Sequence, residues 1–214
     1  MANGATTRMR RSREKILAAA EEVFLGNGFL GANMDAIAET AGVSKQTVYS
    51  HFDSKEALFL EVIATMTGGA AEEIGETVEE VFDDRAVGDY LLNLAIDQLE
   101  VVMTPRLMQL RRMVIGEAGR FPDLGRSLYE NGPMVSIRRI SRALAHFVSQ
   151  GQIRPCDTER AARQFNWMVM GEPTNAAMLL GDEGIPSRRE LQAHATEAVR
   201  VFLCAYGLPP ASEG

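Results

Sequence analysis

The polar side chains that follow Ser44 have the types and the spacing of a surface that contacts nucleic acid. Lys45 and Gln46 come first, and Tyr49 and Ser50 follow one helical turn later, so on a helix all four would share one side. Ammonium and amide groups hydrogen-bond base edges, whereas hydroxyls and cations more often hold phosphate oxygens. The pattern predicts that Lys45 and Gln46 read bases in the major groove of DNA.

Hydroxyls and a cation close to this run are suited to the DNA backbone. Thr47 and Tyr49 carry hydroxyls, and Lys55 adds a cation at the start of the next helix, where free N–H groups already favour anions. Taken singly, each of these residues is an ordinary solvated side chain. The hypothesis of a DNA surface therefore depends on their occurring together.

The elements that must position these residues are two short helices joined by a tight turn. Ala38 gives the first helix a small apolar contact, and Gly42 can adopt the positive φ that the turn requires. Val43 fills the corner, and Val48 and Phe52 lie on the inner side of the second helix. Any helical hairpin could show such apolar spacing, but the glycine at the turn favours a helix-turn-helix.

The run Thr47-Val-Tyr-Ser-His-Phe-Asp-Ser-Lys-Glu-Ala-Leu58 resembles the signature of the TetR family of transcriptional regulators. Its position after Met34-Asp-Ala-Ile-Ala and Gly42-Val-Ser is similar as well, and the resemblance covers about residues 10–63. It implies a DNA-binding regulator. The remainder, about residues 64–210, is only loosely similar to the helical domains of that family and most resembles its AefR-like subgroup.

The resemblance also implies roles for individual residues. Thr47, Tyr49 and Lys55 would contact phosphates, while Lys45 and Gln46 would read bases. Asn33 stands where the family more often has threonine, and it would cap a helix and approach a phosphate. The expected DNA contacts are Asn33, Ser44, Lys45, Gln46, Thr47, Tyr49, Ser50 and Lys55.

The charge distribution is compatible with a DNA partner, although the chain as a whole carries a net charge of −7. Residues 1–15 hold five cationic side chains and one carboxylate, and the first 60 residues are neutral. A DNA contact needs local cations rather than a basic chain. A solvated, frayed N-terminus is the alternative reading of the arginine cluster.

Helical periodicity runs through nearly the whole chain, and no segment shows sustained strand alternation. The expected helices cover about 8–27, short segments after Asn33 and Ser44, and then 53–82, 87–103, 105–117, 123–150, 157–180 and 187–206. Gly68-Gly69 could kink the fourth helix, whose second half is acidic, and Gly132-Pro133 could break the seventh. Asp53-Ser-Lys-Glu56 and Ser187-Arg-Arg-Glu190 have the spacing of capping boxes, and Asp53 or Ser54 would cap the fourth helix.

These features predict an all-α fold of about nine helices. Residues 1–62 would form a three-helix, homeodomain-like helix-turn-helix head, and residues 63–210 would form a helical effector-binding and dimerisation domain. The expected protein is a cytoplasmic repressor that leaves a palindromic operator when a small, mostly apolar ligand binds. No apolar stretch reaches the length of a membrane span, and no cofactor is expected.

A ligand pocket is predicted among the middle helices from large apolar and sulfur-containing side chains. Eleven methionines suit an adaptable pocket, because the thioether chain repacks readily. The alternative is that these side chains simply fill a core. The expected lining is Met66, Leu94, Leu99, Met103, Met108, Met113, Phe147, Trp167 and Met170.

A homodimer interface is predicted on the last two long helices, since the family resemblance implies pairing at this end of the chain. Both helices carry apolar stripes, although such stripes also bury into a monomer's own core. The expected interface residues are Phe165, Met168, Leu191, Ala195, Ala198, Val199 and Phe202.

Motifs of other protein classes are weaker in this sequence. Gly26-Asn-Gly-Phe-Leu-Gly31 matches G-x-G-x-x-G, but a helix rather than a strand precedes it, so a helix cap and loop is the expected reading. The three histidines lack metal-ligand spacing, and Cys156 and Cys204 are expected to be reduced thiols rather than a disulfide. An all-helical enzyme and a helical adaptor without DNA binding stay open as alternatives.

Overall fold

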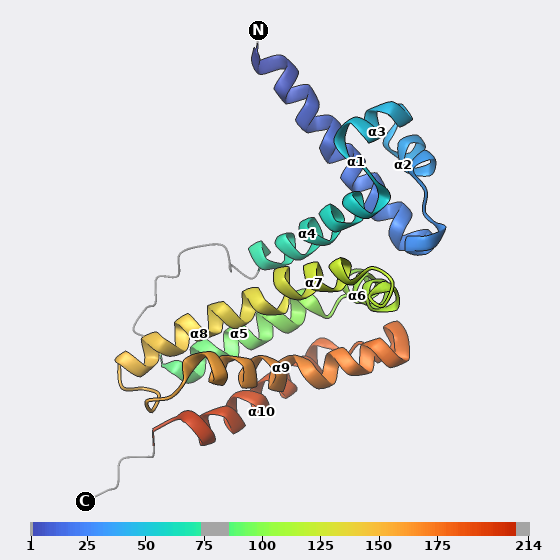
Figure 1. Cartoon of the computed structure of the whole chain (residues 1–214). Helices are drawn as coiled ribbons and strands as arrows, with labels where there is room; N and C mark the ends of the chain where they lie inside the picture. The colour runs from blue at the N-terminus through green and yellow to red at the C-terminus, as the bar shows by residue number, and fades with distance from the viewer. Residues whose placement is uncertain (1, 74–85, 209–214) are drawn as a thin grey trace, which may run out of the picture. The chain divides into compact units, whose positions relative to one another are not determined.

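The computed structural model describes residues 2–73 and 86–208, and within these ranges all the regular secondary-structure elements are helices (Figure 1). Ile153 and Gly207 form a single isolated antiparallel bridge. The helices are α1 (Ala2–Gly31), α2 (Met34–Ala41), α3 (Lys45–His51), α4 (Lys55–Glu73), α5 (Val87–Val102), α6 (Pro105–Glu117), α7 (Pro122–Asn131), α8 (Pro133–Ser149), α9 (Thr158–Leu180), the 3-10 helix η1 (Gly181–Gly184) and α10 (Arg188–Tyr206). The predicted all-α fold is confirmed.

The chain packs as two compact units. The first contains the residues up to Thr67 together with Gln109–Leu128, and the second contains Gly68–Met108 and the chain from Tyr129 onward. Each unit therefore consists of two separate segments of the chain, whereas the predicted domains, residues 1–62 and 63–210, are each one continuous segment. That division stays a prediction about functional domains.

An aromatic cluster forms the core of the first unit. Phe24 lies 4.6 Å from Phe59 between ring centroids, and Phe29 lies 5.1 Å from Phe59 and 5.0 Å from Phe121. Phe24, Phe29 and Phe59 are buried. Because aromatic pairs at these separations add to the free energy of burial, the cluster ties α1 and α4 to the segment between α6 and α7.

The second unit is a group of long helices around one continuous core, to which α5, α6, α8, α9 and α10 all contribute. Within it α8 packs along α9, and α10 packs along α5 and α9. At one end, the backbone N–H of Arg154 donates to the carbonyl of Tyr206 at 3.0 Å and fixes the loop before α9 to the end of α10.

Helix ends follow the local signals closely. Asp157 caps α9 by accepting from the N–H of Arg160, and Ser187 forms the predicted reciprocal box with Glu190 at the start of α10. The predicted break at Gly132-Pro133 is present, and it separates α7 from α8. The described residues therefore form ten α-helices instead of the predicted nine, because this break divides the predicted helix 123–150 into α7 and α8.

Two local expectations need correction, and the structure decides between two predicted caps for α4. The first helix begins at Ala2 rather than near residue 8, and Gly28 interrupts it with φ 72° before it ends at Gly31. Helix α4 continues through Gly68-Gly69 without a break. Ser54 rather than Asp53 caps this helix, since its hydroxyl accepts from the N–H of Ala57 at 3.1 Å.

Part of the acidic half of the fourth helix lies outside the described residues. Helix α4 is described to Glu73, so its predicted continuation to residue 82, with Glu76, Glu79 and Glu80, falls beyond it. Where helices are described, none combines the length and the apolar character that crossing a bilayer requires.

Candidate nucleic-acid interface

The turn between α2 and α3 has the geometry that the sequence predicts. Gly42 has φ 64° and ψ 37°, a left-handed conformation that a side chain would strain. Its N–H donates to the carbonyl of Glu39 at 3.1 Å, and the N–H of Val43 donates to the carbonyl of Ala38 at 3.0 Å. These bonds satisfy the end of α2 and set the direction in which α3 leaves.

Helix α3 divides into an inner and an outer side. Val48 is fully buried and Phe52 nearly so, and both face the core of the first unit. The outward residues Ser44, Lys45, Gln46, Tyr49 and Ser50 are exposed, while Thr47 is half-buried. The helix therefore presents Lys45, Gln46, Tyr49 and Ser50 on its exposed side.

Hydroxyl groups at the ends of α3 are partly engaged in local hydrogen bonds. The Ser44 oxygen accepts from the Thr47 N–H at 3.1 Å, which caps the helix, and the two hydroxyls lie 2.8 Å apart. The Ser50 hydroxyl donates to the Thr47 carbonyl at 2.7 Å. Ser44 and Ser50 are thus held in fixed orientations on the outer face.

Lys45 is fixed by a carboxylate from the preceding helix. Its Nζ lies 2.8 Å from Oδ1 and 3.0 Å from Oδ2 of Asp35. The hydrogen bond that Lys45 donates to Asp35, and then the charge of that carboxylate, raise the pKa of Lys45 above the ordinary lysine value. The sequence predicts Lys45 on the outer face but not Asp35 beside it, because the two residues are ten positions apart across a turn.

Lys55 bridges the end of α1 to the start of α4. Its Nζ donates to the carbonyls of Phe29 at 2.8 Å and Ala32 at 3.1 Å, and it lies 4.6 Å from the centroid of the Phe29 ring. Two of its three N–H donors are therefore used within the protein. No described residue accepts from the third donor, at the N-terminus of α4.

Asn33 takes the predicted capping position. Its side-chain oxygen accepts from the N–H of Ala36 at 2.9 Å, and its own backbone is extended. The side chain is exposed next to the start of α2. Its amide nitrogen thus lies on the surface, where it could donate to an anion.

Arg13 is a residue whose position the sequence analysis did not foresee. Its guanidinium lies 2.7 Å from the carboxylate of Glu61 on α4 and 5.3 Å from the centroid of the Phe52 ring. It therefore joins α1, α4 and the residue that ends α3. No local pattern signals a contact across 48 residues, and Arg13 stands in the sequence only as one member of a basic cluster.

The rest of that basic cluster lines the surface of α1. Arg8, Arg10, Arg11 and Lys15 are exposed, and Arg10 forms an ion pair with Glu14 at 3.5 Å. The basic N-terminus is thus helical from Ala2, in place of the frayed segment that composition alone allows.

The residues expected to line a ligand pocket are divided between the two units. Leu94, Leu99, Met103, Met108, Phe147 and Met170 belong to the core of the second unit. Met66 and Met113 belong to the first unit, and the Trp167 side chain is exposed at 43%. A pocket lined by all nine stays a prediction.

The expected dimer-interface residues mostly serve the protomer's own core, and this is a correction. Phe165, Leu191, Ala195, Ala198, Val199 and Phe202 are buried, and the rings of Phe165 and Phe202 lie 4.9 Å apart. Only Met168 is half-buried. The apolar stripe of α10 is used against α5 and α9 of the same chain, so those six side chains are not a free surface.

Comparison with known proteins identifies the two parts of the chain. Residues 16–62 match the family described as "Bacterial regulatory proteins, tetR family". Residues 89–208, more than half of the chain, match the "AefR-like transcriptional repressor, C-terminal domain".

Individual proteins agree with both matches. A TetR-family regulator structure from Mesorhizobium loti is 35% identical with a TM-score of 0.84, covering 94% of this chain and 99% of its own. The flavonoid-responsive regulator FrrA is 30% identical with a TM-score of 0.78 at the same coverage. The transcriptional regulator UidR of Escherichia coli K12 is 27% identical over 155 residues, 72% of this chain and 76% of UidR. The chain belongs to the TetR family of helix-turn-helix transcriptional regulators.

Proposed function

We propose that the chain is a repressor that binds a palindromic operator as a homodimer, with α3 in the major groove. The observation that carries this proposal is the outer face of α3, where Lys45, Gln46 and Tyr49 are exposed while Val48 and Phe52 anchor the helix from below. A helix supported in this way presents a rigid polar surface to base edges.

The outer residues divide by their chemistry. Lys45 and Gln46 read bases, because their ammonium and amide groups match the donors and acceptors of the major groove. Asn33, Ser44, Thr47, Tyr49, Ser50 and Lys55 hold the DNA backbone through hydroxyl, amide and ammonium groups. The exposed cations of α1 add attraction that does not depend on sequence.

Exposed apolar side chains on α9 and α10 support a dimer at this end of the chain. Trp167, Leu179 and Leu180 of α9 and Val201 of α10 are exposed, and Leu208 is exposed just beyond α10. Large apolar side chains left in water on neighbouring helices are typical of a surface that a partner covers. We therefore place the interface on these outward residues and not on the buried stripe behind them.

A small, mostly apolar ligand is the proposed effector, and the second unit is its proposed site. FrrA, a relative with 30% identity, carries the name of a flavonoid-responsive regulator, which supports an aromatic effector for this chain. Coupling between effector and operator typically amounts to about 1–3 kcal/mol, or a 5–150-fold loss of DNA affinity. Helix α4 begins at Lys55 on the DNA side and extends past Thr67, so it is the proposed element of that coupling.

Fluorescence anisotropy with palindromes selected from random DNA tests this function. We expect two protomers per palindrome, with half-sites spaced by about 34–36 Å or a multiple, and a steep loss of affinity as salt rises. Failure to bind any selected palindrome, or binding that does not respond to salt, would overturn the proposal. The same result would favour the enzyme or adaptor alternatives.

A further inference from the structure

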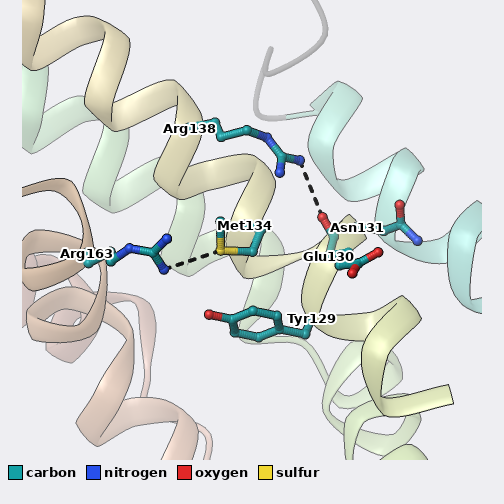
Figure 2. Close-up of a pocket in the computed structure, with 6 residues that line it drawn as sticks. All are labelled: Tyr129, Glu130, Asn131, Met134, Arg138 and Arg163. Atoms are coloured by element: carbon teal, nitrogen blue, oxygen red, sulfur yellow. Dashed lines mark hydrogen bonds between the residues drawn. The ribbon is translucent and has the colours of Figure 1, made fainter. Parts of the chain in front are cut away.

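A pocket of about 500 Å³ opens between the end of α7, the start of α8 and the first part of α9 (Figure 2). Its size falls within the usual range for small-molecule sites. All of its lining lies within the second unit, and none of it belongs to the nine side chains expected from the sequence. The lining residues are Tyr129, Glu130, Asn131, Met134, Arg138 and Arg163.

The two guanidinium groups of the pocket differ in how far they are already paired. Arg163 donates to the Glu159 carboxylate at 2.7 Å and approaches the sulfur of Met134 at 3.6 Å. The hydrogen bond to Glu159, and to a smaller extent Tyr129, raises the pKa of Arg163, so its charge is permanent but largely balanced.

Arg138 forms no ion pair with a carboxylate of the described residues, although Glu130 also lines the pocket. Its one hydrogen bond to a described group is from Nη2 to the backbone carbonyl of Glu130, at 3.4 Å. A neutral carbonyl at that distance satisfies little of a guanidinium, which presents five N–H donors in a planar fork. Figure 2 shows the group turned inward over Met134 rather than away from the pocket. The pocket therefore offers an unused bidentate donor.

Apolar and aromatic surface lies beside this donor. The half-buried Met134 occupies the middle of the pocket between the two arginines, and the ring of Tyr129 lies on the side away from Arg138 (Figure 2). A phenol ring and a thioether favour contact with a flat aromatic group. The guanidinium fork matches the two oxygens of a carboxylate.

We propose that this pocket binds the anion of a small aromatic carboxylic acid, with the carboxylate on Arg138 and the ring between Met134 and Tyr129. The proposal rests on the proposed function, in which the second unit takes a mostly apolar ligand, and it adds the position and the charge of that ligand. An aromatic acid is mostly apolar and carries one anionic group, so it satisfies both conditions.

Isothermal titration calorimetry on the full chain at pH 7 tests the site, with 2-naphthoate as probe and 2-naphthamide as its uncharged counterpart. We expect 2-naphthoate to bind and 2-naphthamide to bind at least about tenfold more weakly, because a hydrogen bond to a charged group is lost. Arg138→Gln should weaken the binding of 2-naphthoate by a similar factor. Arg142→Gln is the matched control, since Arg142 is exposed one turn along α8 and does not line the pocket.

The outcomes separate the site from the regulatory function. No binding of 2-naphthoate to the wild-type chain, equal binding of the acid and the amide, or equal effects of Arg138→Gln and Arg142→Gln would each overturn the proposed site. Circular dichroism melts of both variants check that they fold, which the exposure of both arginines favours. Operator binding measured in parallel tests the proposed function separately, because Arg138 lies outside the proposed DNA surface.

Discussion

The ammonium group of Lys45 on α3 lies 2.8 Å from the carboxylate of Asp35 on α2, across the turn that joins the two helices. Both side chains are exposed, so the pair contributes little to folding stability. Its effect is on the direction and the charge of Lys45. An ammonium group shared with a carboxylate attracts any phosphate less strongly than a free one, and it approaches base edges in a restricted geometry.

Removing the carboxylate of Asp35 should therefore reduce the preference for operator over other DNA rather than the affinity for DNA in general. We expect Asp35→Asn to raise affinity for scrambled DNA more than for operator, so that the ratio of the two dissociation constants falls about five- to tenfold, at the lower end of the range for one base contact. Competition anisotropy at fixed salt measures that ratio. Glu39→Gln is the control, because it removes the same charge from the exposed surface of α2 without touching Lys45. Equal ratios for the two variants would contradict a positioning role for Asp35.

Lys55 should be as important to the fold of the first unit as to DNA. Lys55→Met keeps the aliphatic stem but leaves the carbonyls of Phe29 and Ala32 without their donor, and we expect a loss of about 1–3 kcal/mol in the free energy of unfolding. Urea denaturation measures it, with Lys15→Met on the exposed face of α1 as control. Since Lys55 also holds a phosphate in the proposed complex, Lys55→Met should make the slope of log affinity against log salt shallower by about 1. An unchanged free energy of unfolding would show that the carbonyl bonds contribute nothing.

The dimer should depend on outward residues of α9 and α10. Val201→Glu places a charge on an exposed position of α10, and we expect folded monomers with greatly weakened operator binding. Thr196→Glu is the control on another face of the same helix. Analytical ultracentrifugation distinguishes the two. Phe202→Glu cannot serve, because Phe202 is buried against Phe165 and a charge there would unfold the protomer. A Val201→Glu variant that stays dimeric would move the interface elsewhere.

Two buried amides in the core of the second unit should show strong energetic coupling. Gln98 and Asn166 are 3% and 1% exposed, and Nε2 of Gln98 donates to Oδ1 of Asn166 at 2.9 Å. The remaining Gln98 Oε1 and Asn166 Nδ2 are buried, and neither has a hydrogen-bond partner among the described residues. Replacing either residue by leucine should cost about 1–3 kcal/mol, since the other amide then loses its only bond.

Replacing both amides should cost clearly less than the sum of the single changes. The Gln98→Leu and Asn166→Leu double variant removes both buried amides, so neither is left without its partner. The double-mutant cycle should therefore give a coupling of about 0.5–3 kcal/mol. Urea denaturation of the four proteins measures it. Additive costs would mean that the two amides do not stabilise one another.

The sequence by itself determined the features that depend on neighbours along the chain. The all-α fold, the cap at Asn33, the left-handed turn at Gly42, the cap at Ser44 and the box at Ser187–Glu190 all follow from residues within about four positions of one another. Such signals are readable because one helical turn brings those residues together whatever surrounds them. The exposure of the polar residues of α3 follows in the same way from the helical repeat, which puts the apolar residues of α3 on the opposite side of the helix.

Only the tertiary structure decided which surfaces meet. Periodicity marks an apolar stripe on α10 but not its partner, and packing placed Phe202 against Phe165 in the protomer's own core instead of a dimer interface. The same holds for Arg13 on Glu61, for Lys55 on the carbonyls of Phe29 and Ala32, and for the pocket around Arg138. These contacts join residues far apart in the chain, and their geometry depends on how whole helices pack, which no local spacing encodes.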